Sequence, residues 1–240
     1  RPGARDEDHR SQLLATGSEV MARTALLAGA TGLVGGECLR LLLASSAYSS
    51  VIVVTRRSLG LAAGSAPKLR EVVVDFAGLE RVREQLQADH IFCALGTTIR
   101  KAGSQAKFRE VDFEYPRHLA ELTLAAGATH FSLVSALGAS SASRVFYSRV
   151  KGELEDALRA MPWPGLALLR PSVIAGDRQE SRPVERITEH LLRFAPRAWR
   201  PVPARDIAAA MVATALEAGQ GTRILESAEI PVAAARLRQP

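Results

Sequence analysis

The stretch Gly29-Ala30-Thr31-Gly32-Leu33-Val34-Gly35 joins a short apolar run, residues 25–28, to a segment with helical periodicity, residues 33–43. Its glycines recur every third residue at the junction of an expected strand and an expected helix. They permit a tight turn and a close approach of a pyrophosphate to the backbone, and the helix that follows offers free N–H groups. A purely structural turn in another doubly wound protein is the alternative. The strand–turn–helix context favours a dinucleotide site that includes Gly29 and Gly35.

Short apolar runs alternate with helical patterns along the rest of the chain. Strands are expected at residues 51–54, 72–74, 91–94, 130–135 and 166–170, and helices at 79–87, 104–126, 145–160, 184–194 and 206–218. This alternation predicts an α/β fold of the Rossmann type, a doubly wound parallel sheet with helices on both faces. The weaker pattern after Pro171 is expected to form a small C-terminal segment on the substrate side.

The domain organisation is expected to be simple. No Gly/Ser-rich or Pro-rich linker divides residues 21–240, which predicts one NAD(P)-binding domain. Residues 1–20 are polar and charged, and they are expected to be a disordered extension that takes no part in the fold.

The composition is that of a globular protein, since 47% of the 240 residues are apolar. No apolar run is long enough to span a membrane, and no signal-peptide pattern precedes the first strand. Cys38 and Cys93 lie in apolar stretches, which predicts buried thiols in a reducing compartment and a cytoplasmic protein. The net charge of +6 fits a phosphate-bearing ligand, nucleic acid, an anionic membrane or a mere compositional bias. Because no helix-turn-helix, zinc or RNP-like pattern appears, neither nucleic acid nor a metal is an expected partner.

The second expected strand ends in Thr55-Arg56-Arg57-Ser58. An NAD site places a carboxylate near this point to hold the ribose hydroxyls. Two guanidiniums instead suit the 2′-phosphate of NADP by charge and by bidentate geometry. The sequence therefore favours NADP(H) over NAD(H), with Arg56 and Arg57 as binding residues; a solvated basic turn is the alternative. Asp75, after the third strand, either accepts from the adenine amino group or caps the next turn.

Tyr147 and Lys151 are four residues apart on an expected helix and therefore share one face. An ammonium beside a phenol stabilises the phenolate, which allows proton transfer nearer neutral pH, and the same lysine can hold the nicotinamide ribose. The alternative is an exposed helix whose lysine reaches to solvent. Ser135, at the end of the fifth strand, is the candidate to polarise a substrate carbonyl. Other hydroxyls in the following loop are those of Ser140, Ser141 and Ser143.

These motifs together resemble those of atypical members of the short-chain dehydrogenase/reductase superfamily, in particular the Tat-interacting-protein oxidoreductase-like family. The resemblance runs from Arg23 to about Ala213 and rests on Val73-Val74-Asp75-Phe76, Leu95-Gly96-Thr97-Thr98, Lys101-Ala102-Gly103, Val111-Asp112, His130-Phe131, residues 147–153 (YSRVKGE) and residues 177–183 (DRQESRP). The last motif is the most distinctive, because neither the fold nor cofactor binding in general requires it.

The resemblance implies an NADPH-binding oxidoreductase. Its implied cofactor contacts are Thr31, Gly32, Leu33, Val34, Arg56, Arg57, Leu95, Gly96, Tyr147, Lys151, Ile174 and Arg182. For Arg182, a salt-bridged surface turn is the alternative to closure over the cofactor. The superfamily also often forms dimers through the helices that follow the fourth and fifth strands, so a homodimer is compatible with the resemblance.

Two positions depart from the superfamily pattern. Asp112 stands where extended members often carry Asn, and an ionised Asp accepts hydrogen bonds without donating them, which weakens a proton relay there. Ser135-Ala136 replaces the usual pair of serines, so only one hydroxyl remains.

Two functions follow from these observations. The first is an NADP(H)-dependent oxidoreductase for a small carbonyl or alcohol, in which Tyr147 is the acid/base, Lys151 tunes it and Ser135 orients the carbonyl. The second is an NADPH-binding regulatory or scaffold protein that binds a protein partner with little or no turnover. The Tyr–Lys pair favours the enzyme, because a sensor has no need of a tuned phenol.

Overall fold

The computed structural model describes residues 23–61, 66–175, 199–217 and 219–237. The expected extension at residues 1–20, the expected helix at 184–194 and the DRQESRP motif with Arg182 lie outside the described residues.

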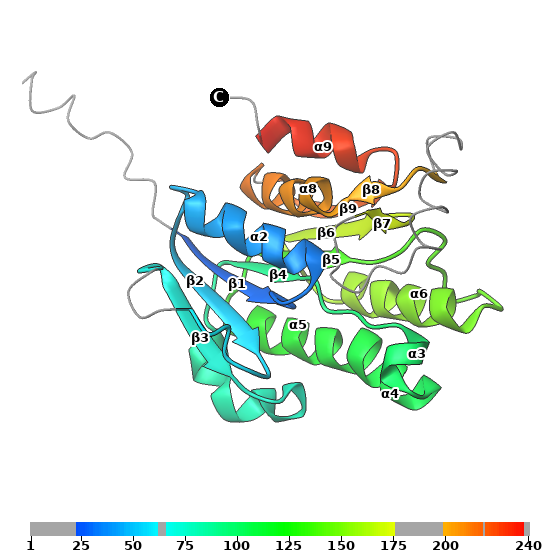
Figure 1. Cartoon of the computed structure of the whole chain (residues 1–240), viewed down its shortest axis with the longest axis horizontal. Helices are drawn as coiled ribbons and strands as arrows, with labels where there is room; N and C mark the ends of the chain where they lie inside the picture. The colour runs from blue at the N-terminus through cyan, green and yellow to red at the C-terminus, as the bar shows by residue number, and fades with distance from the viewer. Residues whose placement is uncertain (1–22, 62–65, 176–198, 218, 238–240) are drawn as a thin grey trace, which may run out of the picture.

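A seven-stranded parallel sheet forms the centre of the molecule, in the order β3-β2-β1-β4-β5-β6-β9 (Figure 1). The strands are β1 (Arg23–Ala28), β2 (Tyr48–Thr55), β3 (Leu69–Val73), β4 (His90–Cys93), β5 (His130–Val134), β6 (Gly165–Arg170) and β9 (Gly221–Glu226). A separate two-stranded sheet pairs β7 (Ile174–Ala175) with β8 (Val202–Pro203). The strand order reverses between β1 and β4, and ligands of such sheets bind at the carboxyl ends of the strands beside this reversal.

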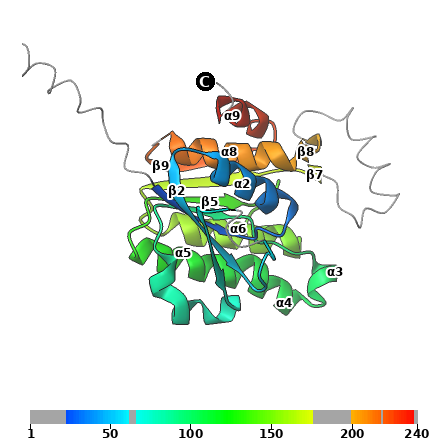
Figure 2. The same cartoon turned by 60° about the vertical axis from the view of Figure 1, so that its left-hand side comes forward.

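Helices cover both faces of the sheet, as Figures 1 and 2 show. One face carries α2 (Leu33–Ala44) and α8 (Ala204–Leu216), with α9 (Ile230–Leu237) packed on α8; the other carries η1 (Phe76–Leu86), α5 (Tyr115–Ala125) and α6 (Phe146–Arg159). Along β1, Leu27 packs into the core beneath α2, while Leu26 packs into the core on the opposite face. Because strand residues alternate between faces and both faces are covered, the central strands β1, β4, β5 and β6 are buried along most of their length and mostly apolar. The edge strands β3 and β9 carry polar, partly exposed residues. The predicted Rossmann-type fold is confirmed.

The C-terminal part of the chain completes the main sheet. Among the described residues of this part, only β7 and β8 stand apart from it as a small segment, whereas α8, β9 and α9 extend the sheet and its cover. The sequence pattern did not predict β9, because this edge strand buries only Leu225 and therefore has no continuous apolar run. The buried, free state predicted for Cys38 and Cys93 is confirmed.

The expected helix over residues 104–126 is interrupted, so that prediction is wrong in its middle. The segment is built from α4 (Gln105–Arg109), the π-helical turn η2 (Glu110–Glu114) and α5. Pro116 has no N–H to donate to the carbonyl of Asp112, and its ring crowds the same carbonyl in a regular α-helix. The wider turn relieves this conflict, and Asp112 within it is fully buried.

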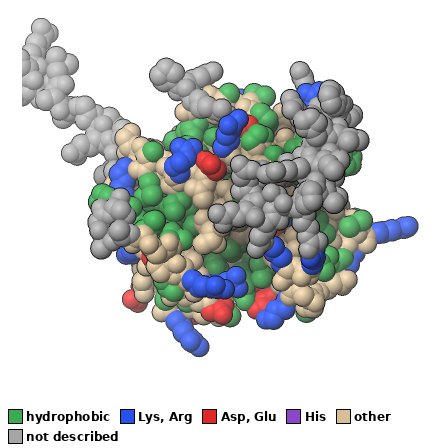
Figure 3. Space-filling view, viewed as in Figure 1, with side chains coloured by type: hydrophobic (Ala, Val, Ile, Leu, Met, Phe, Trp, Pro, Cys, Tyr) green, Lys and Arg blue, Asp and Glu red, His purple; other side chains and the backbone are tan. Residues whose placement is uncertain are grey.

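Charged side chains are distributed rather than gathered. On the face in Figure 3, Lys and Arg stand in several separate places, some of them beside acidic side chains, and not in one continuous band. Many of the described arginines are paired locally, as in Arg117 with Glu121 and Arg40 with Glu37. In the part of the chain that the structure describes, no helix is both long enough and apolar enough to cross a membrane.

Candidate active site

The glycine loop has the geometry that a pyrophosphate requires. Gly29 adopts a φ of +92°, and the Gly32 N–H donates to the Gly29 carbonyl at 3.0 Å. A Cβ on Gly35 would lie 1.9 Å from that same carbonyl oxygen, so α2 can begin this close to β1 only with glycine there. Gly32 caps α2 without a side-chain hydrogen bond, and the first turn holds no acidic residue. The helix N-terminus is thus suited to an anionic ligand.

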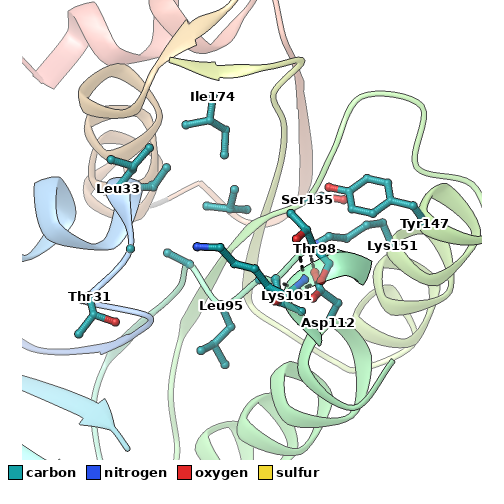
Figure 4. Close-up of a pocket in the computed structure, with 16 residues that line it drawn as sticks. Thr31, Leu33, Leu95, Thr98, Lys101, Asp112, Ser135, Tyr147, Lys151 and Ile174 are labelled. Atoms are coloured by element: carbon teal, nitrogen blue, oxygen red, sulfur yellow. Dashed lines mark hydrogen bonds and ion pairs between the residues drawn. The ribbon is translucent and has the colours of Figure 1, made fainter. Parts of the chain in front are cut away.

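Two adjoining pockets open beside this loop, at the carboxyl ends of the strands. The first pocket has a volume of about 600 Å³ and the second about 690 Å³, and both are lined by the glycine loop and by the loop after β4. The first pocket brings together these predicted site residues: Thr31, Gly32, Leu33, Val34, Leu95, Gly96, Ser135, Tyr147, Lys151 and Ile174. Figure 4 shows Ser135, Tyr147, Lys151 and Asp112 on one side, with Thr31, Leu33 and Ile174 across from them.

The second pocket carries the basic residues. Arg56 and Arg57 line it together with Lys101 and Lys107, and none of its described lining residues is acidic. The Thr55 hydroxyl donates to the Arg57 carbonyl at 2.8 Å, which fixes the turn after β2. Phe76 and Tyr115 also line this pocket, with their rings stacked 5.6 Å apart. The pocket therefore offers flat apolar surface and positive charge, the two properties that bind an adenosine bearing phosphate.

Two of the predicted residues that the structure describes do not line either pocket. Gly35 is buried beneath the loop, where its role is to permit close packing. The Asp75 carboxylate accepts the Ala77 N–H at 3.1 Å and caps η1, which confirms the capping alternative; its contact with adenine stays a prediction. Arg182 lies outside the described residues.

The face that Tyr147 and Lys151 share on α6 points into the first pocket. Tyr147 is half-buried against Phe108, their ring centroids 5.5 Å apart, and Lys151 is only 3% exposed. Its Nζ lies 2.8 Å from Asp112 Oδ1. Burial opposes charge on Lys151, yet the Asp112 carboxylate and the Tyr147 phenol together raise the pKa of Lys151 above its usual value. A lysine that reaches to solvent is thereby excluded.

Asp112 is a site residue that the sequence did not assign. Its Oδ2 accepts the Thr97 N–H at 2.9 Å while Oδ1 faces Lys151, so both carboxylate oxygens have polar neighbours. The sequence showed only that Asp112 is a carboxylate at a position where the superfamily pattern often has Asn. Pro116, four residues later, was the available signal that this stretch of helix is irregular.

Ser135 lines the first pocket, but its hydroxyl is engaged. It donates to Glu155, a fully buried carboxylate that also accepts from Arg170 through Nε at 3.0 Å. A carboxylate can only accept, so the Ser135 proton points to Glu155 and its oxygen is left as an acceptor. The role of Ser135 in orienting a carbonyl stays a prediction. The Ser143 hydroxyl oxygen accepts the Val145 N–H at 3.1 Å within the loop, and the Ser140 N–H donates to the Ser148 carbonyl of α6 at 3.0 Å.

Gly152 allows α6 to approach the loop after β5. A Cβ there would lie 2.1 Å from the Ser140 carbonyl carbon and 2.2 Å from the Ser141 nitrogen. We therefore expect Gly152→Ala to lower the free energy of unfolding by about 2–3 kcal/mol, because backbone atoms must shift. Urea unfolding measures this loss. Gly36→Ala is the matched control, since its Cβ would lie 3.6 Å from the Ala30 carbonyl oxygen, and an equal loss in both variants would contradict the prediction.

The glycine loop at the reversal of a parallel sheet, with a Tyr–Lys pair across the same cleft, defines a dinucleotide-binding protein of the Rossmann type. The chain belongs to the NAD(P)H-binding family, whose model matches residues 29–218. It is 34% identical over 203 residues to Protein HTATIP2 of Rattus norvegicus, an alignment that covers 83% of this chain and 84% of that protein. The predicted resemblance to atypical short-chain dehydrogenases/reductases is thus confirmed.

Two further similarities agree with this assignment. Protein fmp52, mitochondrial, of Aspergillus clavatus is 37% identical over 180 residues, which cover 73% of this chain and 76% of that protein. An oxidoreductase of the short chain dehydrogenase/reductase family from Burkholderia thailandensis superposes with a TM-score of 0.69 at 20% identity, covering 88% of this chain and 94% of that one. The second similarity supports the fold.

The prediction of a cytoplasmic protein is wrong by these comparisons, because several fungal relatives are named mitochondrial. That prediction rested on two free cysteines and on the lack of a signal-peptide pattern. Reduced thiols indicate a reducing environment, and that property alone does not single out the cytoplasm.

Proposed function

We propose that this protein is an NADP(H)-dependent oxidoreductase that transfers hydride between the cofactor and a small carbonyl or alcohol. The observation that carries the proposal is the buried Lys151 beside Tyr147, in the same pocket as the glycine loop. A phenol and an ammonium held together at the edge of a dinucleotide cleft are a suitable acid/base pair.

The residues that line the first pocket divide the binding and the chemistry between them. Bound NADPH supplies the hydride. Tyr147 exchanges its phenolic proton with the substrate oxygen, and Lys151 stabilises the phenolate and holds the nearby ribose. The N-terminus of α2, at Gly32 and Leu33, binds the pyrophosphate. Leu33 and Ile174, which lie across the pocket from Tyr147 in Figure 4, exclude water from the reacting atoms.

The preference for NADP(H) over NAD(H) rests on the second pocket. Arg56 and Arg57 follow β2 where a carboxylate would hold the ribose hydroxyls of NAD, and Lys101 adds positive charge from α3 (Ile99–Ala102). Lys107 of α4 also lines the pocket, but its ammonium is paired with Glu110 at 2.6 Å. A 2′-phosphate placed here meets several cations and no carboxylate among the described lining residues.

A second function is favoured by one observation. The Ser135 hydroxyl donates to Glu155, and residue 136 is Ala, so no serine hydroxyl at the end of β5 is free to polarise a carbonyl. An NADPH-binding regulatory or scaffold protein with little turnover needs no such hydroxyl. Binding without turnover of any substrate would favour this function.

Calorimetric titration with NADPH and NADH tests the cofactor proposal. We expect Arg56→Ala/Arg57→Ala to weaken NADPH binding about 10–100-fold, the loss typical of hydrogen bonds between charged groups, and to leave NADH binding nearly unchanged. Arg40→Ala/Arg83→Ala, which removes two exposed arginines that pair within their own helices, is the control. Equal losses for both cofactors would contradict the NADP preference, and no binding of either cofactor to the unaltered protein would contradict the oxidoreductase.

A further inference from the structure

The Lys151 ammonium has a buried counter-charge. Asp112 is fully buried on the π-helical turn η2, is held by the Thr97 N–H and lies 2.8 Å from Lys151 Nζ. A Cβ on Gly96 would lie 3.5 Å from Asp112 Oδ1 and 3.8 Å from Lys151 Nζ, so the ion pair lies directly behind the loop after β4. The pair is thus a fixed part of the pocket wall.

This counter-charge changes what Lys151 does to its neighbour. A lone ammonium beside a phenol strongly favours the phenolate, whereas an ammonium paired with a carboxylate has no net charge and favours it much less. Asp112 is the single carboxylate among the described residues that line the first pocket.

Other titratable groups around Tyr147 and Lys151 do not replace Asp112. Cys93, from β4, is buried, and burial raises its pKa to about 11, so the thiol is neutral at physiological pH. Glu155, one turn further along α6, is ion-paired with Arg170 of β6. Lys101, from α3, begins beside Asp112, and its ammonium points away from Tyr147 into the pocket, where it adds positive charge (Figure 4).

We propose that Asp112 is a positioning residue that fixes the Lys151 ammonium and offsets its charge, so that Tyr147 holds its proton and the site serves carbonyl reduction. This inference rests on the proposed function and specifies which direction of the reaction, carbonyl reduction, the site favours. In the reduction, Tyr147 gives its phenolic proton to the carbonyl oxygen while the carbonyl carbon accepts the hydride. The phenolate that remains beside Lys151 regains a proton from water.

The test measures phenolate formation by ultraviolet absorbance in the protein without cofactor, so it is independent of cofactor binding and turnover. The chain has three tyrosines. Burial and the Glu110 carboxylate raise the pKa of Tyr115 to about 12, and burial raises the pKa of Tyr48 further. The phase that disappears in Tyr147→Phe is the one that belongs to Tyr147. We expect Asp112→Asn, which keeps the side chain's shape, to move this phase about one pH unit lower.

Asp156→Asn is the matched control. It removes one carboxylate from the same helix as Tyr147, but from an exposed position where it pairs with Arg159, and we expect no shift. A phase that stays in place in Asp112→Asn, or one that moves equally in both variants, overturns the proposal.

A second comparison covers the case in which Asp112→Asn does not fold, as judged by circular dichroism. Lys151→Met leaves Asp112 unopposed and should move the phase to higher pH, whereas Asp112→Asn/Lys151→Met removes both charges and should return it toward the unaltered protein. Failure of the double variant to move the phase back overturns the proposal. If the titration shifts as expected but NADPH does not bind, Asp112 offsets Lys151 as inferred and the proposed function alone fails.

Discussion

Tyr147→Phe is expected to lower NADPH-dependent reduction of a carbonyl substrate by about 10²–10⁴-fold, the usual contribution of a positioned proton donor. Phe keeps the ring and its contact with Phe108 and removes only the hydroxyl, so the pocket keeps its shape. NADPH affinity should stay within about twofold, because the glycine loop and the basic residues after β2 are untouched. Absorbance of NADPH, followed across a panel of small aldehydes and ketones, measures the rate.

Tyr48→Phe is the control for this substitution. Tyr48 begins β2, at the opposite end of the sheet from the cleft, and its hydroxyl lies 2.9 Å from His90 Nδ1. Its loss should leave turnover intact. If Tyr147→Phe keeps the rate of the unaltered protein, the acid/base role of Tyr147 is contradicted. If the unaltered protein reduces no member of the panel while it binds NADPH, the regulatory function becomes the better explanation.

The parts of the fold that the sequence predicts well are those where local chemistry has a single solution. Gly35 must be glycine because a Cβ would overlap the Gly29 carbonyl, so the turn between β1 and α2 is visible in the residues themselves. The central strands are buried on both faces and appear as apolar runs. The spacing of Tyr147 and Lys151 predicted their common face, and the structure adds that Lys151 is buried.

The rest of the site depends on contacts between segments that are distant in sequence. Glu155 contacts Ser135, which lies 20 residues earlier in the chain. Arg170 pairs with Glu155, 15 residues earlier, and with Glu226, 56 residues later. No periodicity along the chain encodes such contacts, so the engagement of the Ser135 hydroxyl was not predictable. Asp112 is an intermediate case: Pro116 indicated an irregular helix, but only the fold shows that the irregular turn faces Lys151.

Acidification from pH 8 to pH 5 is expected to lower the free energy of unfolding by about 4 kcal/mol through two histidines alone. His90 and His130 begin adjacent strands β4 and β5, are 5–6% exposed, and have ring centroids 5.7 Å apart. Burial, with a contribution from the positive charge of Arg23, lowers the pKa of His90 to about 4. The pKa of His130 is lowered to about 3, mainly by burial and to a smaller extent by the positive charges of His90 and Arg223.

The sign follows from comparing the two states. Unfolding returns both imidazoles to a pKa of about 6.5, so below that pH the unfolded chain binds protons that the folded protein excludes. The two histidines therefore leave the free energy of unfolding unchanged above about pH 7, and they lower it as the pH falls through 6.5. The loss ends only when the folded histidines themselves protonate, near pH 4 and pH 3. At pH 5 each histidine accounts for roughly 2 kcal/mol of the loss in unfolding free energy, because one pKa unit corresponds to about 1.4 kcal/mol.

Urea unfolding at pH 8 and pH 5 measures this loss, and His90→Gln/His130→Gln isolates its source. Glutamine can still bond Tyr48 and Ser132, the partners that lie 2.9 Å from His90 Nδ1 and His130 Nε2, but it does not titrate. The double variant should be less stable at pH 8, since cavities and weaker contacts remain, and should lose much less stability on acidification. His118→Gln, whose ring is partly exposed beside Glu80, should keep the full pH dependence. If the double variant loses as much unfolding free energy between pH 8 and pH 5 as the unaltered protein, the acid sensitivity comes from the carboxylates instead. The histidine pair would then contribute to the core by packing alone.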